Sequence, residues 1–163
     1  MDESVNAEVS SKLLNAGFRF VSIRKRSEKE IREFLKKKAL RIAGGLAVLE
    51  EVIEKLRGYG YIDDSVFASW VIESRRSHNP HGTDRIVREL KSKGVSSDII
   101  GESLQKQSSE AKSEKDLARE VAVKIVGRYQ GLPFLEKKRK LFGVLGRRGF
   151  SFSVISSVVD DLV

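Results

Sequence analysis

Residues 85–96 have the sequence RIVRELKSKGVS, and residues 140–151 have the sequence KLFGVLGRRGFS. Both stretches contain an apolar residue, three residues, leucine, three residues, glycine, an apolar residue and serine. An apolar pair then follows, Ile99-Ile100 in the first copy and Val154-Ile155 in the second. Glycine can adopt the left-handed conformation that ends a helix, and a serine side chain can cap the next one. The pattern therefore predicts a pair of short helices joined at glycine, and the chain uses it twice.

A partial third copy lies near the N-terminus, where residues 30–40 have the sequence EIREFLKKKAL. Ser27 and Glu30 form a capping-box pattern at the start of this predicted helix. Ala39 stands where the other copies have glycine, and the apolar pair arrives only at Val52-Ile53. We therefore expect an inserted segment near residues 40–47, after which helical spacing resumes at 46–58.

Neither helix of a pair can bury its apolar stripe alone, so each pair needs a third helix. Helical spacing predicts these at 5–24, 63–77 and 113–130, with Val66, Phe67, Trp70 and Val71 on the apolar face of the second. The predicted fold class is all-α, with three tandem three-helix repeats at residues 1–60, 61–110 and 111–163 in an elongated array. The polar stretch 105–116 is interpreted as a linker or as a solvated helix extension.

Composition restricts the possible functions. The chain has 163 residues and a net charge of +8, which favours polyanions or an acidic protein as partner, with solubility alone as the alternative. The absence of cysteine excludes disulfides, thiolate metal sites and a cysteine nucleophile. We expect no membrane association, because no apolar run is long enough to span a bilayer. The acidic start at residues 1–4 is unlike a signal peptide, so we expect a cytoplasmic protein.

No group of residues indicates catalysis. Asp63-Asp64 is better explained as a helix start than as a catalytic dyad. His78 and His81 flank Pro80 in a predicted surface turn and make an incomplete metal site. We therefore expect no enzyme, metal or cofactor. Tyr59 and Tyr61 are open between a core role and stacking on bases.

The basic residues form clusters that recur in all three predicted repeats. As solvated faces they would only complement helix C-termini. Their recurrence favours a shared face that binds a partner. The candidate partner-binding residues are Lys36, Lys37, Lys38, Arg75, Arg76, Arg85, Arg88, Lys91, Lys93, Lys137, Lys138, Arg147 and Arg148.

Residues 58–68, GYGYIDDSVFA, resemble the signature of the RecX family of bacterial recombination regulators. Residues 24–31, RKRSEKEI, are similar to that family's entry to its first repeat. Gly82, Ile86, Glu89-Leu90 and residues 93–95 resemble its second repeat, and Gly149-Phe150-Ser151 with Val154-Ile155 resembles its third. The resemblance covers residues 13–163, and Ala39 with the insertion departs from it. The signature residues, for which we expect a mainly structural role, are Gly60, Tyr61, Asp63, Asp64, Phe67, Ala68, Gly94 and Gly149.

The resemblance implies a curved array of three three-helix repeats that binds the RecA recombinase filament. It implies that binding limits filament extension and suppresses the ATPase and coprotease activities of RecA, with DNA contacted directly or through the filament. We expect the chain to act as a monomer. The alternative is a basic helical module that binds DNA without RecA.

Overall fold

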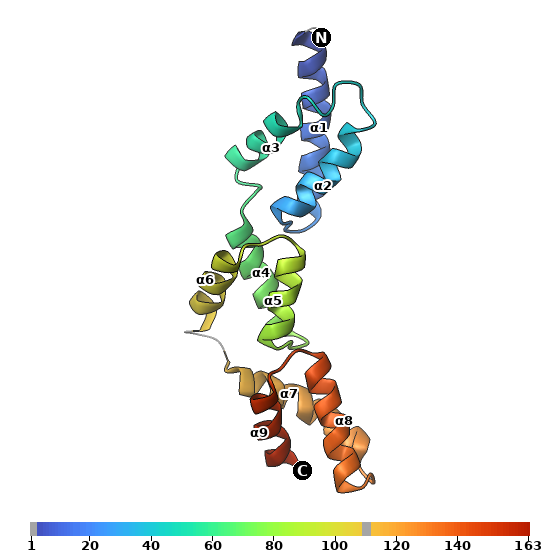
Figure 1. Cartoon of the computed structure of the whole chain (residues 1–163), viewed down its shortest axis with the longest axis vertical. Helices are drawn as coiled ribbons and strands as arrows, with labels where there is room; N and C mark the ends of the chain where they lie inside the picture. The colour runs from blue at the N-terminus through green and yellow to red at the C-terminus, as the bar shows by residue number, and fades with distance from the viewer. Residues whose placement is uncertain (1–2, 109–111) are drawn as a thin grey trace. The chain divides into compact units, whose positions relative to one another are not determined.

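The structure is a computed structural model that describes residues 3–108 and 112–163 (Figure 1). All regular structure in these residues is helical, with nine α-helices, one short 3-10 helix and no strand, which confirms the predicted all-α class. In chain order these elements are α1 (Glu3–Ile23), α2 (Glu28–Ala39), α3 (Leu49–Gly58), α4 (Asp64–Ser77), α5 (Thr83–Ser92), α6 (Ser97–Ser108), α7 (Glu114–Val126), η1 (Gly127–Tyr129), α8 (Phe134–Arg147) and α9 (Phe152–Leu162). None of the helices in the described residues is long and apolar enough to cross a membrane.

Contacts divide the chain into two compact units. Unit 1 extends to Phe67 and includes the short segment Lys93–Ser96. Unit 2 contains Ala68–Ser92 and Ser97–Val163. The turn between α5 and α6 therefore packs with the N-terminal helices, although both helices belong to unit 2.

The core of unit 1 is built by α1, α2 and α3. Leu13 of α1, Leu35 of α2 and Ile53 of α3 are fully buried in it. The predicted capping box starts α2, because the Ser27 hydroxyl accepts the Glu30 amide at 3.2 Å and the Glu30 carboxylate accepts the Ser27 amide at 3.3 Å. Burying the aliphatic stripe of three helices supplies the main stabilising free energy of such a bundle.

The predicted insertion is a series of turns between α2 and α3. Gly44 has a φ of 77°, and a Cβ atom on Gly45 would lie 2.4 Å from the carbonyl oxygen of Ala39. These turns occupy the position at which Leu46 was expected to resume a helix. The helix instead begins at Leu49, so the predicted start at residue 46 was wrong by three residues.

In unit 2, the buried face of α4 differs from the predicted one. Ala68, Val71 and Ile72 are buried, whereas Val66 is 44% exposed and Trp70 is only partly buried. Of the four residues predicted on the apolar face, Phe67 and Val71 are buried as expected, Trp70 is partly buried, and the prediction was wrong for Val66. The buried stripe is displaced by about one residue, which turns the face by about 100° on a helix.

The last three helices pack around a second aliphatic core. Leu141 and Leu145 of α8 and Val158 of α9 are fully buried. Ser113 and Ser151 accept the backbone amides of Asp116 at 3.1 Å and Val154 at 3.4 Å, which caps α7 and α9. The polar stretch 105–116 is partly helical, since α6 extends to Ser108 and α7 begins at Glu114. Residues 109–111 of that stretch lie outside the described residues.

The same set of contacts between the first turns of helices occurs once in each unit. We call this set of contacts the joint. In unit 1, the carboxylate of Asp64, the first residue of α4, accepts the amide of Glu28, the first residue of α2, at 2.8 Å. In unit 2, the carboxylate of Glu114, the first residue of α7, accepts the amide of Thr83, the first residue of α5, at 3.0 Å. Each carboxylate satisfies a backbone donor at the beginning of another helix, where the helix dipole favours a negative charge.

A left-handed glycine completes each joint. Gly94, with φ 82°, lies against Lys29 in the first turn of α2, and Gly149, with φ 81°, lies against Arg85 in the first turn of α5. The preceding basic residue makes a polar contact in both cases, from Lys93 to Glu30 at 3.0 Å and from Arg148 to the Pro80 carbonyl at 3.3 Å. The internal repeat is therefore visible in contacts between helices as well as in the sequence pattern.

Candidate anion-binding site

Four arginines meet in one open hollow of unit 2, which has a volume of about 630 Å³. Arg75 comes from α4, Arg85 and Arg88 come from α5, and Arg147 is the last residue of α8. His81 and Glu89 complete the lining. We call these six residues the arginine hollow.

The backbone at the unit 2 joint holds the two sides of the hollow together. The amide of Gly82 donates to the Arg148 carbonyl at 2.9 Å, and the Arg85 guanidinium donates to the Arg147 carbonyl at 3.1 Å. Gly82 has to be glycine here, because a Cβ atom would lie 2.1 Å from the Gly149 carbonyl oxygen. The close backbone approach therefore brings Arg147 next to the cations of α5.

Only one of the four arginines is neutralised within the hollow. Arg75 forms a two-point ion pair with Glu89, with nitrogen–oxygen distances of 2.6 and 2.9 Å, and the hydrogen bonds raise the pKa of Arg75. Among the described residues, Arg85, Arg88 and Arg147 have no ion-pair partner. Three positive charges are thus concentrated on one small surface, where an anion would be attracted.

The pKa of His81 is affected by these positive charges and by burial. Burial lowers the pKa of His81, and the charges of Arg85, Arg148 and Arg75 lower it further. Its Nδ1 atom is buried and has no hydrogen-bond partner within the described part of the chain. His81 lies between α4 and α5, outside both helices, as the predicted turn requires, but it is partly buried and lines the hollow.

The other predicted basic residues lie outside the arginine hollow. Lys36, Lys37 and Lys38 are exposed in the last turn of α2, and Lys91 is exposed near the end of α5. Lys93 pairs with Glu30, and Lys138 pairs with Asp160 at 2.6 Å. Arg76 and Lys137 are partly exposed, and Arg148 contacts Asn79 and Pro80. The structure thus brings together four of the thirteen predicted cations, and places Lys93 and Arg148 in the joints.

The predicted signature residues have structural positions. Gly60 and Gly94 have positive φ angles after helices, and Phe67 and Ala68 are buried. The carboxylate of Asp63 accepts the amides of Ser65 at 2.8 Å and Val66 at 3.1 Å, so it caps α4 as predicted. Tyr61 contacts the edge of Phe18, with 5.3 Å between ring centroids.

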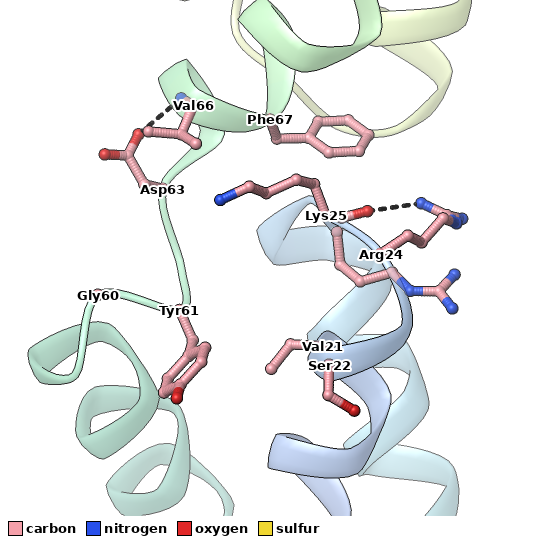
Figure 2. Close-up of a pocket in the computed structure, with 10 residues that line it drawn as sticks. Val21, Ser22, Arg24, Lys25, Gly60, Tyr61, Asp63, Val66 and Phe67 are labelled. Atoms are coloured by element: carbon pink, nitrogen blue, oxygen red, sulfur yellow. Dashed lines mark hydrogen bonds between the residues drawn. The ribbon is translucent and has the colours of Figure 1, made fainter. Parts of the chain in front are cut away.

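A second pocket, in unit 1, has less capacity for an anion. Figure 2 shows it between the end of α1 and the segment from Gly60 to Asp63. Arg24 donates to the Lys25 carbonyl at 2.7 Å and to Glu30 at 2.8 Å, and Arg26 lies 3.8 Å from the same carboxylate. Two of the three cations that line this pocket are therefore already engaged by a carboxylate.

In residues 3–108 and 112–163 no group of three histidine or acidic side chains could hold a metal ion. The described residues thus form an all-α protein with repeated contacts between helix starts and a surface hollow lined by arginines.

Comparisons with known proteins identify the family. Residues 63–104 match the family model described as RecX, second three-helix domain, and residues 113–159 match RecX, third three-helix domain. A Regulatory protein RecX from Pelodictyon phaeoclathratiforme is 35% identical over 145 residues, which cover 89% of this chain and 85% of that protein. The chain belongs to the RecX family.

Two further relatives agree with this assignment. Regulatory protein RecX from Bacillus subtilis is 34% identical over 148 residues, covering 91% of this chain and 54% of that protein. The chain therefore spans about half the length of several curated relatives that it matches. A crystal structure of regulatory protein RecX is 25% identical, with a TM-score of 0.77 over 98% of this chain and 80% of that one.

Proposed function

We propose that this chain is a negative regulator of the RecA recombinase that binds the RecA–DNA filament. Binding limits extension of the filament and its ATPase, coprotease and strand-exchange activities, and so modulates DNA repair and the SOS response. The family assignment and the name of the relatives, Regulatory protein RecX, support a regulatory and non-catalytic role. The observation that carries the proposal furthest is the convergence of four arginines in the arginine hollow.

The repeated architecture suits a filament as partner. We propose three tandem three-helix domains at residues 1–60, 61–110 and 111–163, each presenting some of the predicted cations. Several weak sites on one chain can engage successive subunits, and linkage of the sites raises the overall affinity without any single strong contact. A monomer in the cytoplasm, where the DNA lies, is sufficient for this mode of binding.

We expect substoichiometric amounts of the chain to slow ATP hydrolysis by RecA on single-stranded DNA. The physical reason is that one bound chain blocks or dissociates a filament segment containing many RecA subunits. The measurement is the steady-state ATPase rate at increasing molar ratios of chain to RecA. An unchanged rate at an equimolar ratio contradicts the proposal.

The arginine hollow also favours a second candidate function, in which the chain is a DNA-binding module that acts without RecA. Its affinity for DNA would then fall steeply with salt, because phosphate contacts release counterions. A gel-shift titration at two salt concentrations separates the two functions. Tight DNA binding without RecA and no effect on the filament would favour the second.

A further inference from the structure

We propose that the arginine hollow binds the phosphodiester backbone of a nucleic-acid strand directly. This inference deepens the proposed function and rests on it for its biological meaning, but binding at the hollow requires no RecA. Within the filament, the strand would be the one on which RecA is assembled.

The backbone segments that carry the donors of the hollow are joined to one another before any ligand arrives. The bonds from the Gly82 amide to the Arg148 carbonyl at 2.9 Å and from the Arg85 guanidinium to the Arg147 carbonyl at 3.1 Å join the start of α5 to the end of α8. The bond from the His81 amide to the Arg75 carbonyl at 3.0 Å joins the same segment to α4. A guanidinium group presents its N–H donors in a planar fork that matches the oxygens of a phosphate. Little backbone ordering is then required on binding, which favours affinity.

The charges of the hollow are incompletely balanced in the unbound chain. Glu89, the one acidic residue that lines it, is bound to Arg75, and Arg85, Arg88 and Arg147 face the hollow without a carboxylate partner among the described residues. Mutual repulsion of these cations opposes their assembly at the joint. An anion bound between them removes that repulsion, so binding should also stabilise unit 2.

The lining favours a nucleic acid over an acidic protein surface. All six lining residues are charged or are histidine, and no aliphatic or aromatic side chain other than the imidazole lines the hollow. Protein interfaces combine arginine anchors with buried apolar or aromatic side chains, and the hollow offers none of the latter apart from the imidazole. Interfaces with nucleic acids are more polar and more basic, and most of their hydrogen bonds go to phosphate and sugar.

The test uses the full chain and a fluorescent 30-nucleotide oligo-dT, with binding followed by anisotropy between 50 and 200 mM salt. The variant R88Q/R147Q removes two charges from the hollow and leaves the joint contacts of Arg85 and the pair of Arg75 in place. The control variant R139Q/K140Q removes two charges from exposed positions of α8 outside the hollow. Thermal unfolding midpoints of both variants that are no lower than that of wild type show that folding is retained.

We expect R88Q/R147Q to bind the oligonucleotide at least about tenfold more weakly at 50 mM salt, and to lower the salt slope by about one to two. The control should bind within about threefold of wild type. Equal weakening by the two variants overturns the inference, because binding then depends on overall charge. Tighter binding of a poly-glutamate peptide than of oligo-dT at the hollow also overturns it in favour of an acidic protein.

The pKa of His81 provides a local measurement of oligonucleotide binding at the hollow. The chain has two histidines, so the ring protons of His81 can be followed by NMR with few alternatives to resolve. Saturating oligo-dT should raise the pKa of His81, because the bound phosphate offsets the nearby guanidiniums, and R88Q/R147Q should show a smaller rise. An unchanged pKa at saturation overturns the inference. If binding fails while ATPase suppression persists, only this inference falls; if binding persists while suppression fails, only the proposed function falls.

Discussion

Replacing Gly149 by alanine is expected to lower the free energy of unfolding of unit 2 by about 3 kcal/mol. Gly149 has a φ of 81°, and a Cβ atom there would lie 2.4 Å from the Cβ and 2.6 Å from the amide nitrogen of Arg85. Alanine therefore has both a strained backbone and an overlap with the first turn of α5. Urea unfolding followed by fluorescence of Trp70, the single tryptophan of the chain and a residue of unit 2, measures the effect.

Gly131 provides the matched control. Its φ is 90°, but no atom lies within 4 Å of a Cβ placed on it. Gly131→Ala should therefore cost only the backbone strain, about 1 kcal/mol. Equal effects of the two substitutions would show that close approach at the joint contributes nothing to stability.

Replacing Glu30 by glutamine is expected to destabilise unit 1 by about 3 kcal/mol near neutral pH. The Glu30 carboxylate accepts hydrogen bonds from Arg24 at 2.8 Å, Lys93 at 3.0 Å and the Ser27 amide at 3.3 Å, and its side chain is only 13% exposed. Burial alone would raise the pKa of Glu30, but these three donors outweigh burial and lower it to about 2. The neutral amide cannot compensate two cations that remain beside it.

The effect of this substitution depends on pH with a definite sign. The pKa of Glu30 is lower in the folded state than its ordinary value of 4.5, so the stabilisation is fully present above pH 4.5. It is lost as pH falls from about 4.5 towards about 2. The difference in stability between wild type and Glu30→Gln should therefore shrink over this window.

Native-state hydrogen exchange of the α2 amides is the appropriate measurement for Glu30→Gln, because it reports on unit 1 locally. Glu54→Gln is the control, since Glu54 is 63% exposed and lies 3.4 Å from Arg57 in an ordinary surface pair. Its effect should stay within about 0.5 kcal/mol. A difference between wild type and Glu30→Gln that stays constant from pH 6 to pH 3 would contradict the role assigned to Glu30.

Local signals in the sequence were sufficient for most helix positions. The capping box of Ser27 and Glu30, the cap at Asp63 and the glycine turns at Gly94 and Gly149 involve residues a few positions apart, and the structure confirms them. The local sequence determined the buried face of α4 less well than it determined the helix ends. Val66 and Trp70 are as apolar as the residues that replace them in the core, and the packing of neighbouring helices decides between two adjacent stripes.

Contacts between distant segments were not predictable from local pattern. Asp64 and Glu28 are 36 residues apart, and Lys93 and Glu30 are 63 residues apart. Asp63-Asp64 was expected to serve only the start of α4, whereas Asp64 in fact satisfies the first amide of α2. Asp64 and Glu114 occupy the same position in the repeat, and each carboxylate accepts the first amide of another helix. An acidic residue at this position in both repeats was the sequence feature that could have indicated the contact.

The candidate site, too, was predictable from the sequence only in part. Recurrence of basic clusters predicted a face shared by all three repeats, and this stays a prediction. The arginine hollow contains four of the predicted cations, all from the second and third predicted repeats. Charge alone could not show that Glu89 neutralises Arg75, or that Lys93 and Arg148 serve the joints instead. These distinctions depend on contacts between residues that are 14 to 68 positions apart in the sequence.

The most direct test of the account compares two variants in the RecA ATPase assay on single-stranded DNA. Because the arginine hollow is assigned to the filament's nucleic-acid strand, R88Q/R147Q should need at least about tenfold more chain for half-suppression than wild type. R139Q/K140Q, with the same change in charge, should suppress hydrolysis at nearly the wild-type concentration. Suppression by R88Q/R147Q at the wild-type concentration would contradict the assignment of the hollow as the site where this chain engages the filament.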